Sequence, residues 1–162
     1  MKLLVTGHDE NGKAVFSHVG TPPRGLGTGS YELWSTQGPL SVPDAAAPEA
    51  PADIGYFPVD GETSFKFVTV PPVSEHPRGG PRTMTEDIAH YFDPDDPAMH
   101  TTDTIDYVII LSGQAELELD DGRRETVRQG DCVVQRGTRH AWRVTSEEPL
   151  IMAAVLIGAK RT

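Results

Sequence analysis

The chain has 162 residues, a length that favours one domain around a single buried core. Its 14 lysines and arginines against 24 aspartates and glutamates give a formal net charge of −10, which argues against nucleic acid or a membrane surface as the main partner. The single cysteine, Cys132, excludes an intramolecular disulfide, and its apolar neighbours predict a buried side chain. Without a signal peptide or a run long enough to span a membrane, the sequence predicts a cytoplasmic protein.

Residues 1–61 are expected to pack on the outside of the main domain. Residues 2–5 and 14–18 flank a turn whose Asn11-Gly12 pair is a strong signal for a β-hairpin. From 38 to 58 the chain is rich in proline and alanine and shows little apolar periodicity, which predicts a surface loop.

Residues 62–162 are expected to form a β-barrel, which with the N-terminal part makes one structural domain. Short apolar or alternating runs predict strands at 63–70, 105–111, 114–119, 124–127, 132–135, 141–144 and 150–157. A short helix is expected over 85–92, with Thr85 as its N-cap. Short strands at this spacing, with turn residues between them, predict an all-β antiparallel sandwich or barrel.

Two stretches between residues 100 and 142 resemble the motifs of the cupin superfamily, whose members are small jelly-roll barrels. The first family motif runs His-x-His, three or four residues, Glu, six residues, Gly. The corresponding positions here hold His100, Thr102, Asp106 and Gly113. The second motif, which ends Pro-x-Gly, two residues, His, corresponds to the segment from Gly130 to His140. The resemblance implies a cupin-type double-stranded β-helix.

The resemblance also implies that His100, Asp106 and His140 are catalytic residues that bind one divalent metal ion. Two imidazoles and one carboxylate suffice to hold Zn, Fe, Mn or Ni, and they leave positions free for water or substrate. The alternative is a pocket without metal. Asp106 is shorter than the glutamate of the family, and Thr102 stands where the family has its second histidine.

Further residues near the two motifs are expected to bind the substrate. In extended strands Val108 and Trp142 share the parity of the implied ligands, so they are predicted to line the pocket. Thr102 is expected to contact the substrate or a bound water. Arg139, in the turn before the second motif ends, is a candidate for pairing with a substrate carboxylate.

Similar small cupins serve polyketide or aromatic metabolism as cyclases or decarboxylases. The resemblance therefore implies a metal-dependent lyase of secondary metabolism that acts on an aromatic or polyketide-like carboxylic or β-keto compound, with the ion polarising an oxygen of the substrate. Two alternatives stay open: an Fe(II)-dependent dioxygenase, and a non-catalytic cupin that binds a small molecule without metal. The resemblance also implies a homodimer, and Tyr107 and Ile109, whose parity turns them away from the pocket, are candidates for its contact.

Overall fold

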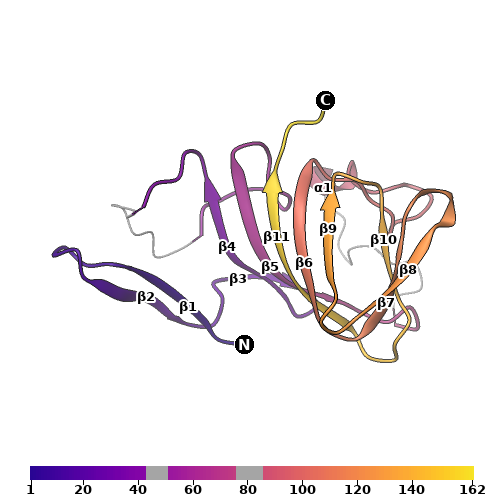
Figure 1. Ribbon diagram of the computed structural model, residues 1–162, viewed down its shortest axis with the longest axis horizontal. Coiled ribbons are helices and arrows are strands. Elements are labelled where there is room, and N and C mark those ends of the chain that lie inside the picture. The colour runs from indigo at the N-terminus through magenta and orange to yellow at the C-terminus, as the bar shows by residue number, and fades with distance from the viewer. Residues whose placement is uncertain (43–50, 76–85) are drawn as a thin grey trace.

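The computed structural model describes residues 1–42, 51–75 and 86–162, and strands dominate this part of the chain (Figure 1). The strands are β1 (Leu3–His8), β2 (Ala14–Gly20), β3 (Arg24–Gly27), β4 (Ser30–Gln37), β5 (Glu62–Val70), β6 (Thr104–Ser112), β7 (Gln114–Glu118), β8 (Arg124–Arg128), β9 (Cys132–Arg136), β10 (Ala141–Val144) and β11 (Leu150–Gly158). A four-residue helix, α1 (Glu86–Ala89), precedes β6. No helix in the described ranges is long and apolar enough to cross a membrane. The predicted all-β class is confirmed.

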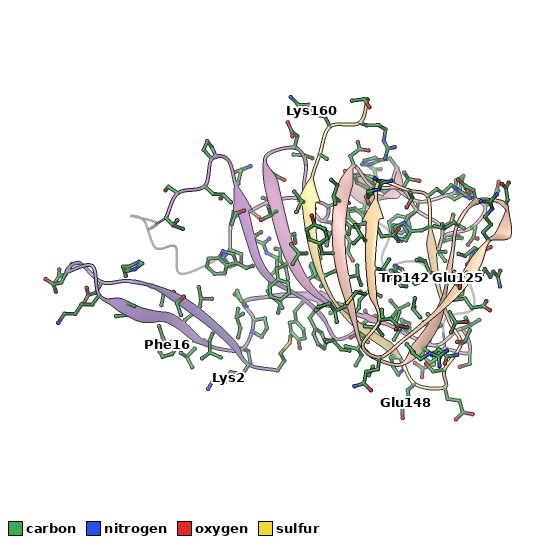
Figure 2. All side chains as sticks on the ribbon, in the orientation of Figure 1. Lys2, Phe16, Glu125, Trp142, Glu148 and Lys160 are labelled. Atoms are coloured by element: carbon green, nitrogen blue, oxygen red, sulfur yellow. The ribbon has the colours of Figure 1, made fainter. Side chains whose placement is uncertain are left out.

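The hairpin β1–β2 forms a two-stranded sheet of its own and projects from the rest of the molecule (Figure 1). The Asp9 carboxylate accepts the backbone N–H groups of Asn11 and Lys13, both at 2.9 Å, and this fixes the turn. Gly12 adopts a φ of +75°, which favours glycine. Phe16 on β2 is 65% exposed (Figure 2). The predicted hairpin is confirmed, with strands longer than expected.

The remaining strands form two antiparallel sheets, and the predicted jelly-roll barrel is confirmed. The larger sheet has the order β3-β4-β5-β11-β6-β9 and the smaller one β10-β7-β8. The chain passes from the larger to the smaller sheet at Gly113, whose φ is +80°. A Cβ there would lie 2.5 Å from the carbonyl oxygen of Pro149, so the position requires glycine.

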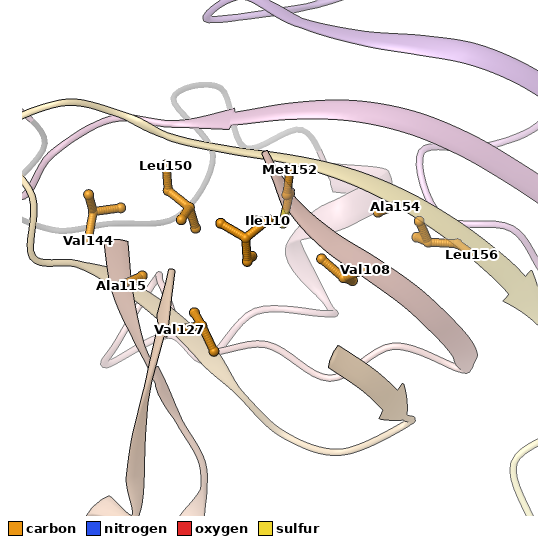
Figure 3. Packing of buried hydrophobic residues seen from close by; sticks show 9 residues of the cluster. All are labelled: Val108, Ile110, Ala115, Val127, Val144, Leu150, Met152, Ala154 and Leu156. Carbon is orange, nitrogen blue, oxygen red and sulfur yellow. The ribbon is translucent and has the colours of Figure 1, made fainter. Parts of the chain in front are cut away.

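The hydrophobic core lies between the two sheets and follows the alternation of β6 and β11. The even-numbered residues 104–110 of β6 and 150–156 of β11 are buried, whereas Tyr107 and Ile109 of β6 point outward and are about half exposed. The buried cluster consists of Val108, Ile110, Ala115, Val127, Val144, Leu150, Met152, Ala154 and Leu156 (Figure 3). Several residues of this cluster, among them Val108, Met152 and Leu156, also line a cavity.

The first 61 residues contribute more to the barrel than the sequence indicates. Strands β3 and β4 were not predicted, yet they extend the larger sheet beyond β5. The boundary proposed between residues 61 and 62 therefore falls between two neighbouring strands of one sheet. In the described part of the proline-rich segment, Pro58 is buried and the N–H of Ala52 donates to the carbonyl of Ser35 at 3.2 Å. Residues 51–58 thus pack against the sheet.

Two local predictions are wrong. Cys132 is exposed, because it begins the edge strand β9 and pairs with Ile109 on the outward face of the sheet. The described helix ends at Ala89 instead of extending to residue 92. Phe92 instead forms an isolated β-bridge with His100, and this bridge requires extended backbone. Thr85, the expected N-cap, lies outside the described residues.

We expect Gly158→Ala to destabilise the fold, because a Cβ at this position would overlap the carbonyl of Val59, which is backbone and has little freedom to move. Overpacking of this kind costs roughly 1–3 kcal/mol, a fall in melting temperature of about 5 °C for a chain of this size. Thermal unfolding followed by circular dichroism measures the change. Gly25→Ala is the matched control, since nothing lies within 4 Å of a Cβ there. Equal melting temperatures of the two variants would contradict the assigned packing.

Candidate functional site

A cavity of about 610 Å³ opens on the inward face of the larger sheet. Most of its lining is apolar and includes Val68, Val108, Met152 and Leu156. A smaller set of polar side chains enters the same cavity: Lys66, His100, Asp106, Gln135 and His140. An apolar pocket with a few converging polar groups is typical of a small-molecule site.

Two histidines face each other at this cavity, because main-chain hydrogen bonds join their segments. The N–H of each residue donates to the carbonyl of the other at 2.9 Å. The imidazole centroids of His100 and His140 are consequently 4.2 Å apart. His140 is 3% exposed and His100 is partly buried. A residue that precedes β6 and a residue that precedes β10 thus form one pair.

Backbone carbonyls determine the tautomer of both rings. The Nδ1 atom of His100 lies 3.1 Å from the carbonyl oxygen of Ala98, and that of His140 lies 2.9 Å from the carbonyl oxygen of Thr138. A carbonyl oxygen only accepts hydrogen bonds, so each Nδ1 carries the proton. In a neutral ring each Nε2 then keeps a free lone pair.

Both rings are neutral at physiological pH. Burial lowers the pKa of His140 from 6.5 to about 3, and the neighbouring His100 lowers it further, while the bond to Thr138 opposes the shift. Burial also lowers the pKa of His100. The pair therefore offers hydrogen-bond acceptors to a ligand and carries no positive charge.

Asp106 places a carboxyl group in the same cavity. It is 8% exposed, and burial raises its pKa, against the opposing effects of Thr104 and Lys66. Within the described residues, its Oδ1 atom has no hydrogen-bond partner, and neither does Nε2 of Gln135, its neighbour across β6 and β9. Buried polar atoms are nearly always paired in folded proteins. These two atoms are therefore available to a ligand.

Lys66 is a cavity residue that sequence reasoning missed. It lies on β5 opposite Glu32 of β4, and the two residues are 3% and 2% exposed. Glu32 pairs with Arg24 and accepts a hydrogen bond from Ser64 at 2.8 Å. Phe65 and Phe67 lie on the opposite face of β5 from Lys66. Because both are apolar, the sequence pattern favours their face as the buried one.

The structure brings five of the seven predicted site residues to the cavity: His100, Asp106, Val108, His140 and Trp142. Thr102 is buried, and its hydroxyl shares a 2.8 Å hydrogen bond with that of Thr104 instead of lining the cavity. Arg139 lies outside the cavity, where its guanidinium pairs with Asp93 at 2.6 Å and with Asp120 at 3.1 Å. These two residues therefore do not line the cavity.

The predicted three-ligand metal site is not assembled. His100 and His140 converge, but the described ranges contain no group of three His, Cys, Asp or Glu side chains placed to hold an ion. Asp106 sits on β6 beside Gln135, and its side chain is one methylene shorter than the glutamate of the family motif. The residues present therefore do not fit a metal bound by His100, Asp106 and His140 together.

Residues 90–156 match the family model described as Cupin domain. The matched segment, about two fifths of the chain, is similar to cupin domains. A solved structure, a Cupin 2 conserved barrel domain protein from Salinispora arenicola, is similar with a TM-score of 0.40 and 22% identity over 60% of this chain and 64% of that one.

Several fungal proteins are similar in sequence. Oryzines biosynthesis cluster protein J of Aspergillus oryzae is 40% identical over 52 residues, which are 32% of this chain and 29% of that protein. The cupin-domain-containing oxidoreductase virC of Hypocrea virens is 28% identical over 85% of this chain and 64% of its own length. The cupin-domain-containing oxidoreductase srdB of Neurospora crassa is 28% identical over 96% of this chain and 72% of its own length. Phomopsin biosynthesis cluster protein C' of Diaporthe leptostromiformis is matched over only 24% of its length.

The neutral histidine pair predicts how stability depends on pH. A folded-state pKa below the unfolded value means that the unfolded chain binds protons first, so stability is complete above about pH 6.5 and falls as the pH decreases toward 3. For His140 the loss amounts to about 1 kcal/mol between about pH 7.5 and about pH 5.5. Urea unfolding of the wild type and His140→Gln at both pH values measures this loss. If the free energy of unfolding of His140→Gln depends on pH as that of the wild type does, the prediction is wrong. It is also wrong if the exposed-site control His8→Gln changes this dependence equally.

Asp106→Asn is expected to raise stability near pH 7. The pKa of Asp106 is raised because burial disfavours the ionised carboxylate, so this group lowers the free energy of unfolding at neutral pH. The destabilisation disappears as the pH falls through the pKa of the folded state. Asparagine has nearly the same shape and no charge. Urea midpoints at neutral pH, compared with those of the exposed-site control Asp95→Asn, test this expectation. A lower midpoint for Asp106→Asn than for the control would contradict it.

Proposed function

We propose that this cupin is an enzyme of secondary metabolism, a lyase of the decarboxylase or cyclase type acting on a small aromatic or polyketide-like carboxylic or β-keto compound. The observation that carries the proposal is the neutral His100–His140 pair beside the Asp106 carboxyl in a largely apolar cavity. Titratable groups whose environments move their pKa values in opposite directions are typical of acid–base sites.

The chemistry follows from the protonation states of these groups. The free Nε2 atoms accept hydrogen bonds, so they can orient an enol or phenol hydroxyl. Asp106, with its raised pKa, can donate a proton to a carbonyl oxygen or to carbon as charge develops there. Polar groups already fixed in position stabilise that charge without reorganisation.

The apolar wall complements these groups. Val108 and Trp142 line the cavity next to the polar set, and the Trp142 ring lies edge-on to His140 with centroids 6.2 Å apart. An aromatic substrate finds a surface there that excludes water. A carboxylate removed from water loses CO2 more readily, because the charge spreads as the bond breaks.

The similar proteins support a role in secondary metabolism and suggest a second candidate function. Oryzines and phomopsin biosynthesis cluster proteins are among the similar proteins, and virC and srdB are named oxidoreductases. An oxidoreductase acting on the same class of compound is therefore the alternative. Product mass distinguishes the two, since a decarboxylase removes CO2 whereas an oxidoreductase changes the number of hydrogens or oxygens.

Turnover of benzoylacetate and longer aromatic polyketo acids tests the proposal. We expect the wild type to release CO2 above the uncatalysed rate, and His140→Gln to lower kcat/KM by about 100-fold, the usual loss for a group acting in proton transfer. His8→Gln, far from the cavity, serves as the matched control. Binding without turnover would support a small-molecule-binding cupin instead, and equal rates in wild type and His140→Gln would contradict the assigned site.

A further inference from the structure

We propose that Lys66 is a catalytic nucleophile that forms a Schiff base with a ketone or aldehyde carbonyl of the ligand in the cavity. The proposal rests on the substrate class of the proposed function and assigns it a covalent step. Covalent catalysis by lysine requires an amine that is desolvated and that the carbonyl carbon can reach. Whether Lys66 meets these two requirements depends on where its side chain lies in the barrel.

The strand register places the Lys66 side chain inside the barrel. On one side of β5 it pairs with Glu32, and on the other side it pairs with Ala154 of β11. The small alanine leaves space over the sheet next to Lys66, and both residues line the cavity. The other lysines of the sequence, Lys2, Lys13 and Lys160, are all exposed.

The contacts of Lys66 are not those of a structural ion pair. Its Nζ atom donates to the carbonyl of Tyr56 and lies 4.0 Å from the centroid of that ring and 5.3 Å from that of Phe57. In the described ranges no carboxylate forms a close ion pair with it, because Glu32, the acidic residue across the strands, is held by Arg24. The amine therefore keeps bonding capacity toward the cavity.

The burial of Lys66 favours the free amine. Burial lowers the pKa of Lys66 to about 8, an effect that Glu32 and Asp106 oppose and Arg24 reinforces. The fall from 10.5 raises the share of free amine at neutral pH by about two orders of magnitude. Only the free amine attacks a carbonyl.

The step balances with the groups present. The amine of Lys66 adds to the carbonyl carbon and passes one of its protons to the carbonyl oxygen. A second proton, taken from the solvent, lets this oxygen leave as water, and an iminium forms. With a β-keto acid, the bond to the carboxylate then breaks, CO2 departs, and its electron pair moves into the iminium to give an enamine. A proton, which Asp106 can supply, adds to the enamine carbon. Water hydrolyses the iminium, releases the ketone and restores the amine.

Reductive trapping tests this inference. The wild-type protein is incubated with benzoylacetate and sodium cyanoborohydride, and the adduct is located by intact-mass and peptide mass spectrometry. We expect one reduced imine per chain, on the peptide that contains Lys66. Lys160→Arg is expected to trap like the wild type. Lys66→Arg, checked for folding by circular dichroism, is expected to form no adduct. Its turnover is expected to fall at least 100-fold.

The outcomes separate the two proposals. Turnover without an adduct on Lys66, or an adduct only on exposed lysines or the N-terminal amine, overturns the Schiff base and leaves the proposed function in place. A specific adduct on wild-type Lys66 supports the inference even if Lys66→Arg fails to fold. If neither turnover nor an adduct is seen with benzoylacetate and its longer analogues, both proposals fail.

Discussion

The reciprocal main-chain hydrogen bonds between His100 and His140 are the constraint on which the site depends. They join the segment that leads into β6 to the start of β10, strands of two different sheets. Because each Nδ1 also contacts a backbone carbonyl, the main chain determines both the position and the tautomer of the rings. The barrel thus presents two fixed lone pairs to a cavity, and this arrangement needs no further side chain to hold it.

The rest of the cavity places ionisable groups where water is scarce. Asp106, Lys66 and Glu32 are each less than a tenth exposed, although burial of an ionised group opposes folding. Glu32 is compensated by Arg24 and Ser64, whereas Oδ1 of Asp106 has no hydrogen-bond partner within the described residues and the amine of Lys66 donates to the carbonyl of Tyr56. An arrangement of this kind lowers stability and raises reactivity, which is the usual balance at a functional site.

The sequence was informative at positions where the residue type and the face of the strand on which the residue lies indicate the same role. The turn residues and the alternation of β6 and β11 predicted the barrel, and the motif resemblance led to the histidine pair and Asp106. Lys66 was missed because its strand alternates Phe65 with polar residues, so the apolar face looked like the buried one. Arg139 was expected in the cavity because it precedes His140, and Thr102 because it occupies the motif position of the family's second histidine. Ion pairs hold Arg139 elsewhere, and the Thr102 hydroxyl contacts that of Thr104. The partners of Arg139 come from distant segments, and no local pattern indicates them.

The proton on the His140 ring is the most direct measure of how the main chain holds the histidine pair. Nitrogen NMR of the labelled protein reports which ring nitrogen of His140 carries the proton. We expect a neutral ring with the proton on Nδ1 at neutral pH, unchanged down to about pH 5 because the pKa is lowered to about 3. A proton on Nε2, or an imidazolium that forms with a pKa near 6.5, would contradict it.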